Sequence, residues 1–568
     1  MFRTTLMTAA AAALTLASGA AAQEQGAKPA AKAPKAMVSS GHPLVTQAMI
    51  EVLKKGGNAM DAALTGAILQ NVVEPQMVSL AGALTALYYD AKTKQYYYLD
   101  ADLDHTAKGA PTVPGWAQVT GGPLPTEATS GQLVAVPGAV AGLKAAADKF
   151  GTLKWSQYFQ PAIKTAEQGF PMYSFLYGEM ADAALGRLSA YPSGREEFLP
   201  NGYVPPVGSN VQRPRLAATM RRLANEGPDY FYTGDFSRRF VAEVQKTGGS
   251  LSQEDMAGYK VRWIEPLRFT YKGREIISAP PPGTAGALMA VAMNVVEPWD
   301  LKAGGHYTQS AESLFKIRSA FGFAEDMTDG FIQDPETFNV PTSVLTSKAF
   351  SAQLTALIDG SMPKVAATKS AAAENDALVL AGGFDHSDVH ASDTDHIIVA
   401  DAQGNIVSLT HSVMGATFAT GLVVDGVVVN GGNYFPGRNL AKGRRVVSGF
   451  APTMVAEAGV PTLAIGSPGL TSRAIALTLI NHYGYDMPLE QAVDAARFQG
   501  SQQGRAMSIE GRITDEVRAQ MKELYGVTVK ITTPYNWHFG SIHAAAKQPD
   551  GTWLGVADPR RGGFAAGY

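Results

Sequence analysis

The sequence contains no cysteine, which excludes disulfide bonds, thiolate zinc sites and cysteine nucleophiles. Neither sign of charge dominates, because 47 Lys and Arg residues stand against 50 Asp and Glu residues, a formal net charge of −3. Without a basic excess, there is no reason to expect a nucleic-acid partner. Beyond the N-terminal segment no apolar run reaches the roughly 18 residues that a membrane-spanning helix needs.

Common catalytic motifs are also missing. The sequence has no G-x-S-x-G, no Walker A loop, no G-x-G-x-x-G and no H-E-x-x-H. Their absence argues against a lipase-type hydrolase, an NTPase, a dinucleotide-dependent enzyme and a zincin. We therefore expect no cofactor.

One segment has residues of the metal-binding type. Residues 385–390 read Asp-His-Ser-Asp-Val-His, and two histidines four apart would share one face of a helix. The stretch from Ala371 to Ser392 that contains them is polar, alanine-rich and turn-like. This favours a solvated linker, and we expect no metal site.

Apolar residues make up 46% of the 568 residues and charged residues 17%, which is too apolar for a disordered chain. No repeat of 20–50 residues is present. The chain is long enough to bury a large core in more than one layer.

The N-terminus is typical of a secretory signal peptide. Arg3 supplies a positive charge, an apolar stretch follows, and Ala20-Ala21-Ala22 is a small-residue cleavage site before Gln23. We predict a signal peptide over residues 1–22, export to the periplasm or medium, and a flexible leader over residues 23–36, where Lys, Pro and Ala alternate without apolar periodicity.

The pattern along the rest of the chain is α/β. Two helices and a hairpin are predicted before residue 101, over 44–55, 58–73, 83–90 and 95–100, with Asn58 as a helix cap. Residues 140–326 are mostly helical in pattern. From Thr394 the chain is β-rich, and short strands are predicted over 396–401, 405–413, 422–424, 427–430 and 462–465, the last followed by a helix from about Ser472.

The boundary between polar linker and strand reads Ser392-Asp393-Thr394-Asp395-His396. Here the chain resembles the γ-glutamyltranspeptidase family of N-terminal-nucleophile hydrolases, whose T-[TAS]-H-x-S-V-V-D-x-x-G-N is similar to Thr394 through Asn405. Further matches follow the family's order over nearly the whole mature chain: Lys55-Gly56-Gly57-Asn58-Ala59-Met60-Asp61-Ala62-Ala63, Val73-Glu74-Pro75, Val136-Pro137-Gly138, Phe150-Gly151-Thr152-Leu153, Pro280-Pro281-Pro282, Gly466-Ser467-Pro468-Gly469 and Asp558-Pro559-Arg560-Arg561.

The resemblance implies a four-layer αββα sandwich and self-cleavage of the bond between Asp393 and Thr394. One precursor would give a large subunit, residues 37–393 after the leader, and a small subunit, residues 394–568, which together form one composite domain. A threonine hydroxyl is a poor nucleophile without a base. Cleavage frees the α-amine of Thr394 beside its own hydroxyl, and its ordinary pKa, near 8, suits proton transfer to form an acyl-enzyme.

The resemblance also implies supporting residues. The backbone N–H groups of Gly469 and Leu470 would stabilise the oxyanion. The family usually has glycine at the second position, and a positive φ there would strain Leu470. Ser412 and His396 are expected to support the nucleophile rather than carry the acyl group.

The sequence departs from the family in the pocket that holds the γ-glutamyl group. Asp102 stands where relatives have the arginine that binds the α-carboxylate, and Tyr434 replaces the aspartate that binds the α-amine. The paired serines become Ser448-Gly449, and Ser79–Leu84 replaces a glycine-rich run. Arg438 is a candidate replacement anion binder, although an exposed loop arginine is the simpler explanation.

Three functions are compatible with these observations. The first is an exported amidohydrolase or acyltransferase of this family with a non-standard acyl group in a small-molecule amide or peptide-like substrate. The second is a genuine glutathione or γ-glutamyl hydrolase-transpeptidase. The third is an unprocessed, non-catalytic binding protein, which a denaturing gel distinguishes because it would remain one chain.

Overall fold

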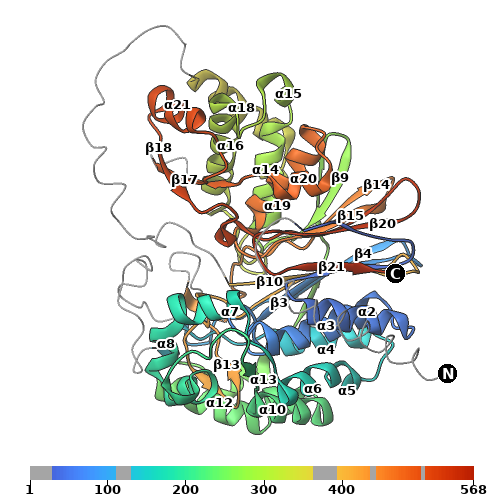
Figure 1. The fold of residues 1–568 in the computed structure, drawn as a ribbon, viewed down its shortest axis with the longest axis vertical. Helices are drawn as coiled ribbons and strands as arrows, with labels where there is room; N and C mark the ends of the chain where they lie inside the picture. Colours follow the sequence, from blue (N-terminus) through green and yellow to red (C-terminus); the bar gives the residue numbers. More distant parts are fainter. Residues whose placement is uncertain (1–27, 110–129, 330, 363–392, 435–442, 501–505) are drawn as a thin grey trace, which may run out of the picture.

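The computed structural model of the chain describes residues 28–109, 130–329, 331–362, 393–434, 443–500 and 506–568. Its centre is a pair of stacked seven-stranded sheets with helices on both outer faces (Figure 1). The predicted four-layer αββα sandwich is therefore confirmed.

The first sheet contains the start of the small-subunit region. Its strand order is β21-β2-β10-β11-β3-β4-β7, and every neighbouring pair is antiparallel. The strands are β21 (Phe564–Gly567), β2 (Met37–Ser40), β10 (Asp395–Ala400), β11 (Ile406–Ser412), β3 (Ala83–Asp90), β4 (Gln95–Ala101) and β7 (Arg262–Ile264).

The second sheet is also antiparallel, with the order β1-β20-β19-β15-β14-β9-β8. Its strands are β1 (Ala31–Ala33), β20 (Trp553–Ala557), β19 (His543–Lys547), β15 (Val460–Gly466), β14 (Thr453–Glu457), β9 (Arg274–Ser278) and β8 (Leu267–Tyr271). Smaller sheets pair β5 (Phe170–Pro171) with β6 (Asn210–Val211), β12 (Val423–Val424) with β13 (Val427–Val428), and β17 (Ala506–Glu510) with β16 (Phe498–Gln499) and β18 (Thr528–Thr532).

Three apolar clusters correspond to the three interfaces of the sandwich. Alternate side chains of each strand point to opposite faces, so Ile397 and Val399 pack against helices while Ile398 and Ala400 pack between the sheets. The layer between the sheets is rich in alanine and tyrosine.

Helices of residues 43–258 pack on the first sheet and beyond it, in the lower half of Figure 1. They are α2 (Pro43–Lys54), α3 (Ala59–Val73), α4 (Ala139–Phe150), α5 (Trp155–Tyr158), α6 (Gln160–Gln168), α7 (Ser174–Gly178), the π-helical η4 (Glu179–Ala184), α8 (Leu185–Ala190), α9 (Pro192–Phe198), α10 (Pro214–Glu226), α11 (Pro228–Tyr232), α12 (Asp235–Lys246) and α13 (Gln253–Gly258).

Helices on the second sheet occupy the upper half of Figure 1. They are α14 (Ala285–Val296), α15 (Leu301–Gly304), α16 (Ala311–Asp329), α17 (Thr342–Leu345), α18 (Lys348–Ser361), α19 (Thr471–Leu479), the π-helical η8 (Ile480–Gly484), α20 (Leu489–Asp494) and α21 (Asp515–Tyr525). Short 3-10 turns are η3 (Ser130–Leu133), η5 (Pro200–Gly202), η7 (Gly432–Tyr434) and η9 (Trp537–Phe539).

Elements with strong local signals lie where the sequence predicts them. Asn58 caps α3 through a capping box with Asp61, because each side chain bonds the other residue's backbone N–H. The β3–β4 and β10–β11 hairpins and the helix after β15 are confirmed within one or two residues.

Two expectations differ from the structure. The flexible leader was expected to extend to residue 36, but Ala31–Ala33 forms β1 and pairs with β20, and the Ala33 side chain is buried. The region predicted to be mostly helical also contains the strands β7, β8 and β9. Their alternating patterns are short and are masked by the longer helical pattern around them. β1 and β7 pair with strands that are distant in sequence, whereas β8 and β9 form a local hairpin that also joins β14.

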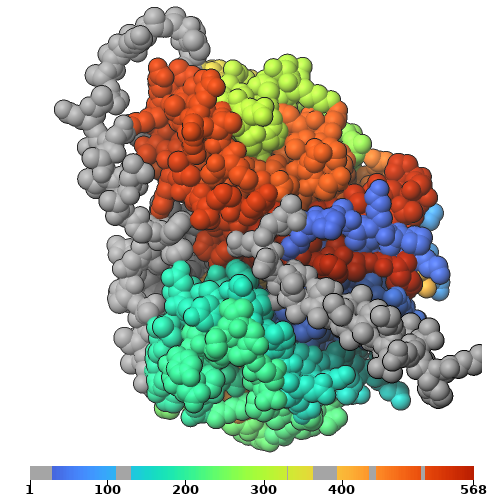
Figure 2. All heavy atoms as spheres, in the orientation of Figure 1, coloured from blue at the N-terminus to red at the C-terminus, as the bar shows by residue number. Residues whose placement is uncertain are grey.

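Both central sheets mix strands from the two sides of the Asp393–Thr394 bond. In the first sheet β2, β3, β4 and β7 precede the bond, whereas β10, β11 and β21 follow it. Figure 2 shows the same mixing on the surface, where blue N-terminal residues lie between orange and red C-terminal ones. The two predicted subunits thus share one fold.

Candidate active site

Thr394 is completely buried and directly precedes β10, at the end of the first sheet. Continuing the strand register by one residue places Thr394 opposite Ser412, Ser412 opposite Ala83, and Ala83 opposite Asp102. Residues opposite one another on neighbouring strands point to the same face. The predicted nucleophile, one predicted supporting residue and the altered pocket residue therefore form one row.

Ser412 touches the bond that is predicted to break. Its hydroxyl donates a hydrogen bond to the carbonyl oxygen of Asp393, and it accepts one from the backbone N–H of Met414 at 2.9 Å. A donor at this position polarises the carbonyl of the Asp393–Thr394 peptide bond. The sequence expectation that Ser412 lies beside Thr394 agrees with this placement.

Arg561 lies on the other side of Thr394. Its Nη1 donates to the Thr394 carbonyl oxygen at 2.9 Å, and its guanidinium lies 4.8 Å from the ring centre of Trp537 and 5.4 Å from that of Phe175. It precedes β21, on the β2 side of β10. Arg561 belongs to the family motif Asp558-Pro559-Arg560-Arg561, but the sequence alone assigns it no role.

Two further residues that sequence reasoning missed hold the side chain of Asp393. The Thr417 hydroxyl lies 2.8 Å from Glu179 Oε2 and 3.1 Å from Asp393 Oδ1. Burial raises the pKa of Glu179 to about 7 and raises that of Asp393 well above its usual range, the latter with a contribution from Glu179. Because a hydroxyl carries one hydrogen, a protonated carboxyl must donate in one of these bonds.

His396 faces the second sheet, two residues along β10 from Thr394. Its Nδ1 lies 2.9 Å from Thr410 Oγ1 and its Nε2 lies 3.1 Å from Ser408 Oγ, and burial lowers its pKa well below the usual value. The ring packs so closely on Gly466 that a Cβ there would lie 2.0 Å away. Both ring nitrogens are engaged with β11, which is consistent with a positioning role.

Asp395 points to the opposite face, towards the helices. It faces Glu74 across Gly41, where an added Cβ would lie 2.6 Å from an oxygen of each carboxyl. Burial raises the pKa of both groups, and Arg561 opposes the rise in each. Glu74 accepts a 2.8 Å bond from Gln70. A buried acid pair therefore lies directly behind the nucleophile.

The turn predicted to supply oxyanion donors follows β15, whose last residue packs on His396. Gly469 has φ +76°, whereas Leu470 has φ −71° and caps α19. Leu470 is therefore not strained, because the left-handed conformation falls on the glycine. A Cβ at Gly469 would also lie 3.1 Å from Gly540 Cα.

The altered pocket lies at the far end of the row. Asp102 is buried and accepts a 2.7 Å bond from the Leu103 N–H, and the Ser448 side chain hydrogen-bonds to its carboxyl. Burial, with repulsion from Asp100, raises the pKa of Asp102 to about 7. The structure thus brings Asp102 and Ser448 together, with Gly449 half-buried next to them.

Arg445, which sequence reasoning missed, neutralises this acidic segment. Its guanidinium forms ion pairs with Asp100 at 3.1 Å and Asp104 at 3.2 Å, and it donates to the backbone oxygen of Asp102 at 2.7 Å and to Tyr259 Oη at 2.7 Å. Three alternating aspartates after an apolar strand are a signal that a buried cation must lie nearby.

Some predicted residues lie outside what the structure describes. Arg438 and residues 385–390 fall in undescribed ranges, and of Tyr434 only its place at the end of η7 is described. Within the described ranges, no cluster of three or more His, Asp or Glu side chains is arranged to hold a metal ion. The helices in those same ranges are too short or too polar to span a bilayer.

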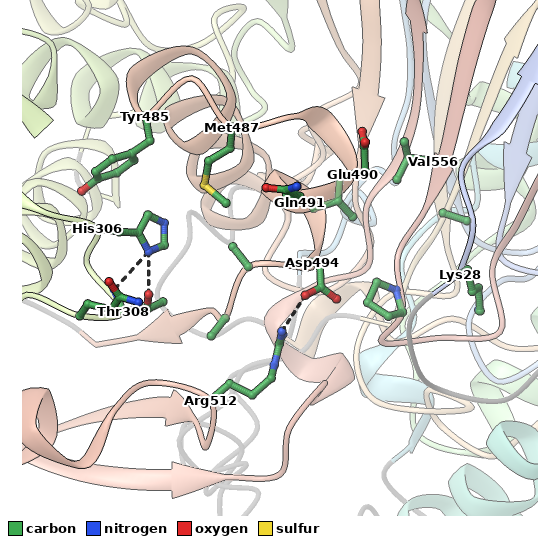
Figure 3. A pocket seen from close by; sticks show the side chains of 16 residues that line it. Lys28, His306, Thr308, Tyr485, Met487, Glu490, Gln491, Asp494, Arg512 and Val556 are labelled. Atoms are coloured by element: carbon green, nitrogen blue, oxygen red, sulfur yellow. Dashed lines mark hydrogen bonds and ion pairs between the residues drawn. The ribbon is translucent and has the colours of Figure 1, made fainter. Parts of the chain in front are cut away.

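Thr394 lines neither of two prominent cavities. The larger, about 700 Å³, is lined by Lys28, His306, Tyr485, Asp494 and Arg512 among others (Figure 3). The second, about 280 Å³, lies beside α7 and α9. In the uncut chain the candidate nucleophile is enclosed.

Comparison with known proteins identifies the class. The model of the family described as gamma-glutamyltranspeptidase matches residues 45–568, so the chain belongs to this family. It is an enzyme of the hydrolase and acyltransferase type that the sequence resemblance predicts.

The relatives differ in the activity that their names state. The chain is 30% identical to the glutathione hydrolase proenzyme of Bacillus subtilis (strain 168), over 94% of this chain and 91% of the relative. It is 32% identical to the acylase ACY 1 proenzyme of Pseudomonas sp. (strain SE83), over 93% of both. A cephalosporin acylase from Bacillus halodurans has the same fold, with a TM-score of 0.80, 22% identity, and coverage of 96% and 98%.

Proposed function

We propose that this protein is an exported proenzyme that cuts itself between Asp393 and Thr394 and then acts as an amidohydrolase or acyltransferase through Thr394. The observation that carries the proposal is the hydrogen bond from Ser412 to the Asp393 carbonyl, beside a buried threonine at the start of β10. Both relatives named above are called proenzymes.

Self-cleavage begins with attack of Thr394 Oγ on the Asp393 carbonyl carbon. The C–N bond breaks, the α-amine of Thr394 takes up a proton, and an ester joins Asp393 to Thr394. Ser412 stabilises the developing charge on the carbonyl oxygen. Water then hydrolyses the ester and releases the new carboxyl end of the large subunit.

The mature site uses the same hydroxyl. The free α-amine of Thr394 accepts the hydroxyl proton, and Oγ attacks the amide carbonyl of the substrate. The N–H groups of Gly469 and Leu470 are the proposed donors to the oxyanion, and His396 positions β10 against β11. The amine product then departs. The acyl ester that remains on Thr394 is attacked by water or by another amine.

The acyl group that enters the row towards Asp102 is expected to lack an α-carboxylate. Asp102 repels a carboxylate when ionised, and Arg445 is already occupied by Asp100 and Asp104. Loss of a charge-assisted contact costs roughly 1.5–3 kcal/mol, so γ-glutamyl amides should be about ten- to a hundredfold poorer substrates than in ordinary relatives. Acyl groups that are neutral or carry a cation should perform better.

The second candidate is a genuine γ-glutamyl hydrolase, which the 30% identity to a glutathione hydrolase proenzyme favours. A matched pair of anilides separates the two. The γ-glutamyl and 4-aminobutanoyl groups differ only in the α-carboxylate. A preference for the γ-glutamyl anilide would support the second candidate, and Asp102→Arg with Tyr434→Asp should restore that preference in the first.

The experiment that tests self-cleavage is a denaturing gel with N-terminal sequencing of the purified protein. We expect two chains, the smaller starting at Thr394. A larger chain starting at Gln23 would also support removal of the signal peptide. An intact chain, or a cut at another bond, would refute the assignment of Thr394.

A further inference from the structure

The guanidinium of Arg561 is only partly hydrogen-bonded. Nη1 bonds the Thr394 carbonyl, whereas Nε and Nη2 are buried and have no hydrogen-bond partner among the described residues. The side chain is only 1% exposed. Nε and Nη2 form one edge of the guanidinium, the geometry that accepts both oxygens of a carboxylate.

The carboxyls near Arg561 do not fill that edge. Glu74, Asp395, Asp393 and Glu179 each lie within electrostatic range of Arg561, but none is hydrogen-bonded to its Nε or Nη2. A buried arginine edge without a bonded anion is costly. The two unpaired donors of this edge are therefore available to an additional anion.

Two half-buried aromatic side chains border the site. Phe175 and Trp537 flank the guanidinium and are both only half-buried, and their rings meet edge to face at 5.4 Å. Asp393 lies within electrostatic range of Arg561, and cutting its bond to Thr394 would free it to move away. Cleavage would thus open space beside the unpaired edge.

The position indicates which half of a substrate is bound. Asp102 lies across β11 and β3 from Thr394, whereas Arg561 lies on the β2 and β21 side. An amide held at Thr394 that places its acyl group towards Asp102 directs its amine half towards Arg561.

We propose that the Nε–Nη2 edge of Arg561 binds a carboxylate on the amine half of the substrate or on the acceptor amine. This inference rests on the proposed function. The substrate class is an amide with a neutral or cationic acyl group joined to a carboxylate-bearing amine, such as an amino acid, a peptide end or an aminobenzoate.

Calorimetry on the cut enzyme with two amines tests the proposal. The probes 4-aminobenzoate and 4-aminobenzamide have the same shape and differ in charge. We expect the carboxylate to bind about ten- to a hundredfold more tightly. Equal affinities would overturn the proposal while leaving self-cleavage and turnover intact.

Variants locate the effect. Arg561→Lys keeps a donor for the Thr394 carbonyl but removes the bidentate edge, so the preference should fall to about one, while the matched control Arg512→Lys should retain it. If the Arg561→Lys protein does not cut itself, binding of the two probes to the Trp537→Leu variant is the test instead. This substitution should weaken both probes several-fold, and unchanged binding would place the site elsewhere and refute the assignment.

Kinetics and the uncut chain provide the remaining readouts. With 4-aminobutanoyl amides of the two amines, the carboxylate should act mainly by lowering KM. Uncut Thr394→Ala protein should bind neither probe, because Asp393 still closes the site. Tight binding of 4-aminobenzoate to the uncut chain would contradict this location.

Discussion

Arg445 and Arg561 lie at opposite ends of the same sheet, both 1% exposed, and they differ in how fully they are bonded. Arg445 pairs with two carboxylates and donates to two backbone oxygens and a tyrosine. Among the described residues, the Arg561 side chain donates one hydrogen bond, to the carbonyl oxygen of the candidate nucleophile Thr394. A buried arginine that is ion-paired with two carboxylates stabilises the fold, whereas one with an open edge next to a reactive residue can serve a ligand.

Substitution of Thr394, which lies between the two arginines, should give the largest effect. Thr394→Ala removes the hydroxyl that both cleavage and turnover require, so we expect one uncut chain and no detectable amidase activity. Intact mass spectrometry and an anilide assay measure this. Thr394→Ser is the matched control and should still cut; cleavage at the same bond in the alanine variant would rule out Thr394 as the attacking group.

Arg445→Met tests how much the arginine that is paired with carboxylates contributes to stability. It leaves the buried Asp100 and the half-buried Asp104 without their cation, and the removal of one partner from a buried ion pair typically costs about 3–5 kcal/mol. Urea unfolding of the Thr394→Ala chain gives the free energy of unfolding without interference from cleavage.

The exposed Arg238 provides a control for this measurement, since Arg238→Met should change stability by no more than about 0.5 kcal/mol. Arg561→Met should cost less than Arg445→Met, because fewer bonds are lost. A larger loss at Arg561 would reverse the comparison.

Ser412→Ala should slow self-cleavage. Loss of one donor to a developing oxyanion lowers rates by about 10²–10³ in the best-studied case. The half-time for appearance of the small subunit after synthesis at low temperature measures it, with Ser412→Thr as the conservative control. An unchanged half-time would show that the hydrogen bond to Asp393 has no part in the cleavage step.

The uncut Thr394→Ala chain should lose stability as pH rises. The pKa of Glu179 is about 7 when folded and near 4.5 when unfolded, so the folded chain binds more protons between these values. Its free energy of unfolding should fall by about 1–3 kcal/mol from pH 5 to pH 8 on account of this group. Glu179→Gln in the same background should flatten that part of the profile, and an identical slope in both chains would contradict the assignment.

The smallest expected effect concerns specificity at the Asp102 end. The pKa of Asp102 is about 7, so acid neutralises it and reduces its repulsion of an α-carboxylate. The ratio of kcat/KM for γ-glutamyl over 4-aminobutanoyl anilide should rise about three- to tenfold from pH 8 to pH 6. Titration of the Thr394 amine affects both substrates alike and cancels in the ratio. Asp102→Asn should make the ratio independent of pH.

Strong local patterns made part of this structure predictable. The capped helix at Asn58, the hairpins around β3–β4 and β10–β11, and the family motif around Thr394 are contiguous in sequence. Strand alternation also placed Thr394 and His396 on one face of β10. Strands β1 and β7 were not predictable in this way, because each is short and depends on a partner far along the chain.

The sequence by itself determined the α/β class and the family, and it predicted the nucleophile and an altered glutamyl pocket, because these depend on residue identity and pattern within short segments. Only the tertiary structure decided which charged groups are satisfied. Arg560 and Arg561 are neighbours in sequence, yet Arg560 pairs with Glu510 and Asp558 while Arg561 reaches Thr394 with an edge unpaired. The physical reason is that burial and partners set the cost of a charge, and they come from separate parts of the chain: Glu510 lies 50 residues from Arg560, and Thr394 lies 167 residues from Arg561.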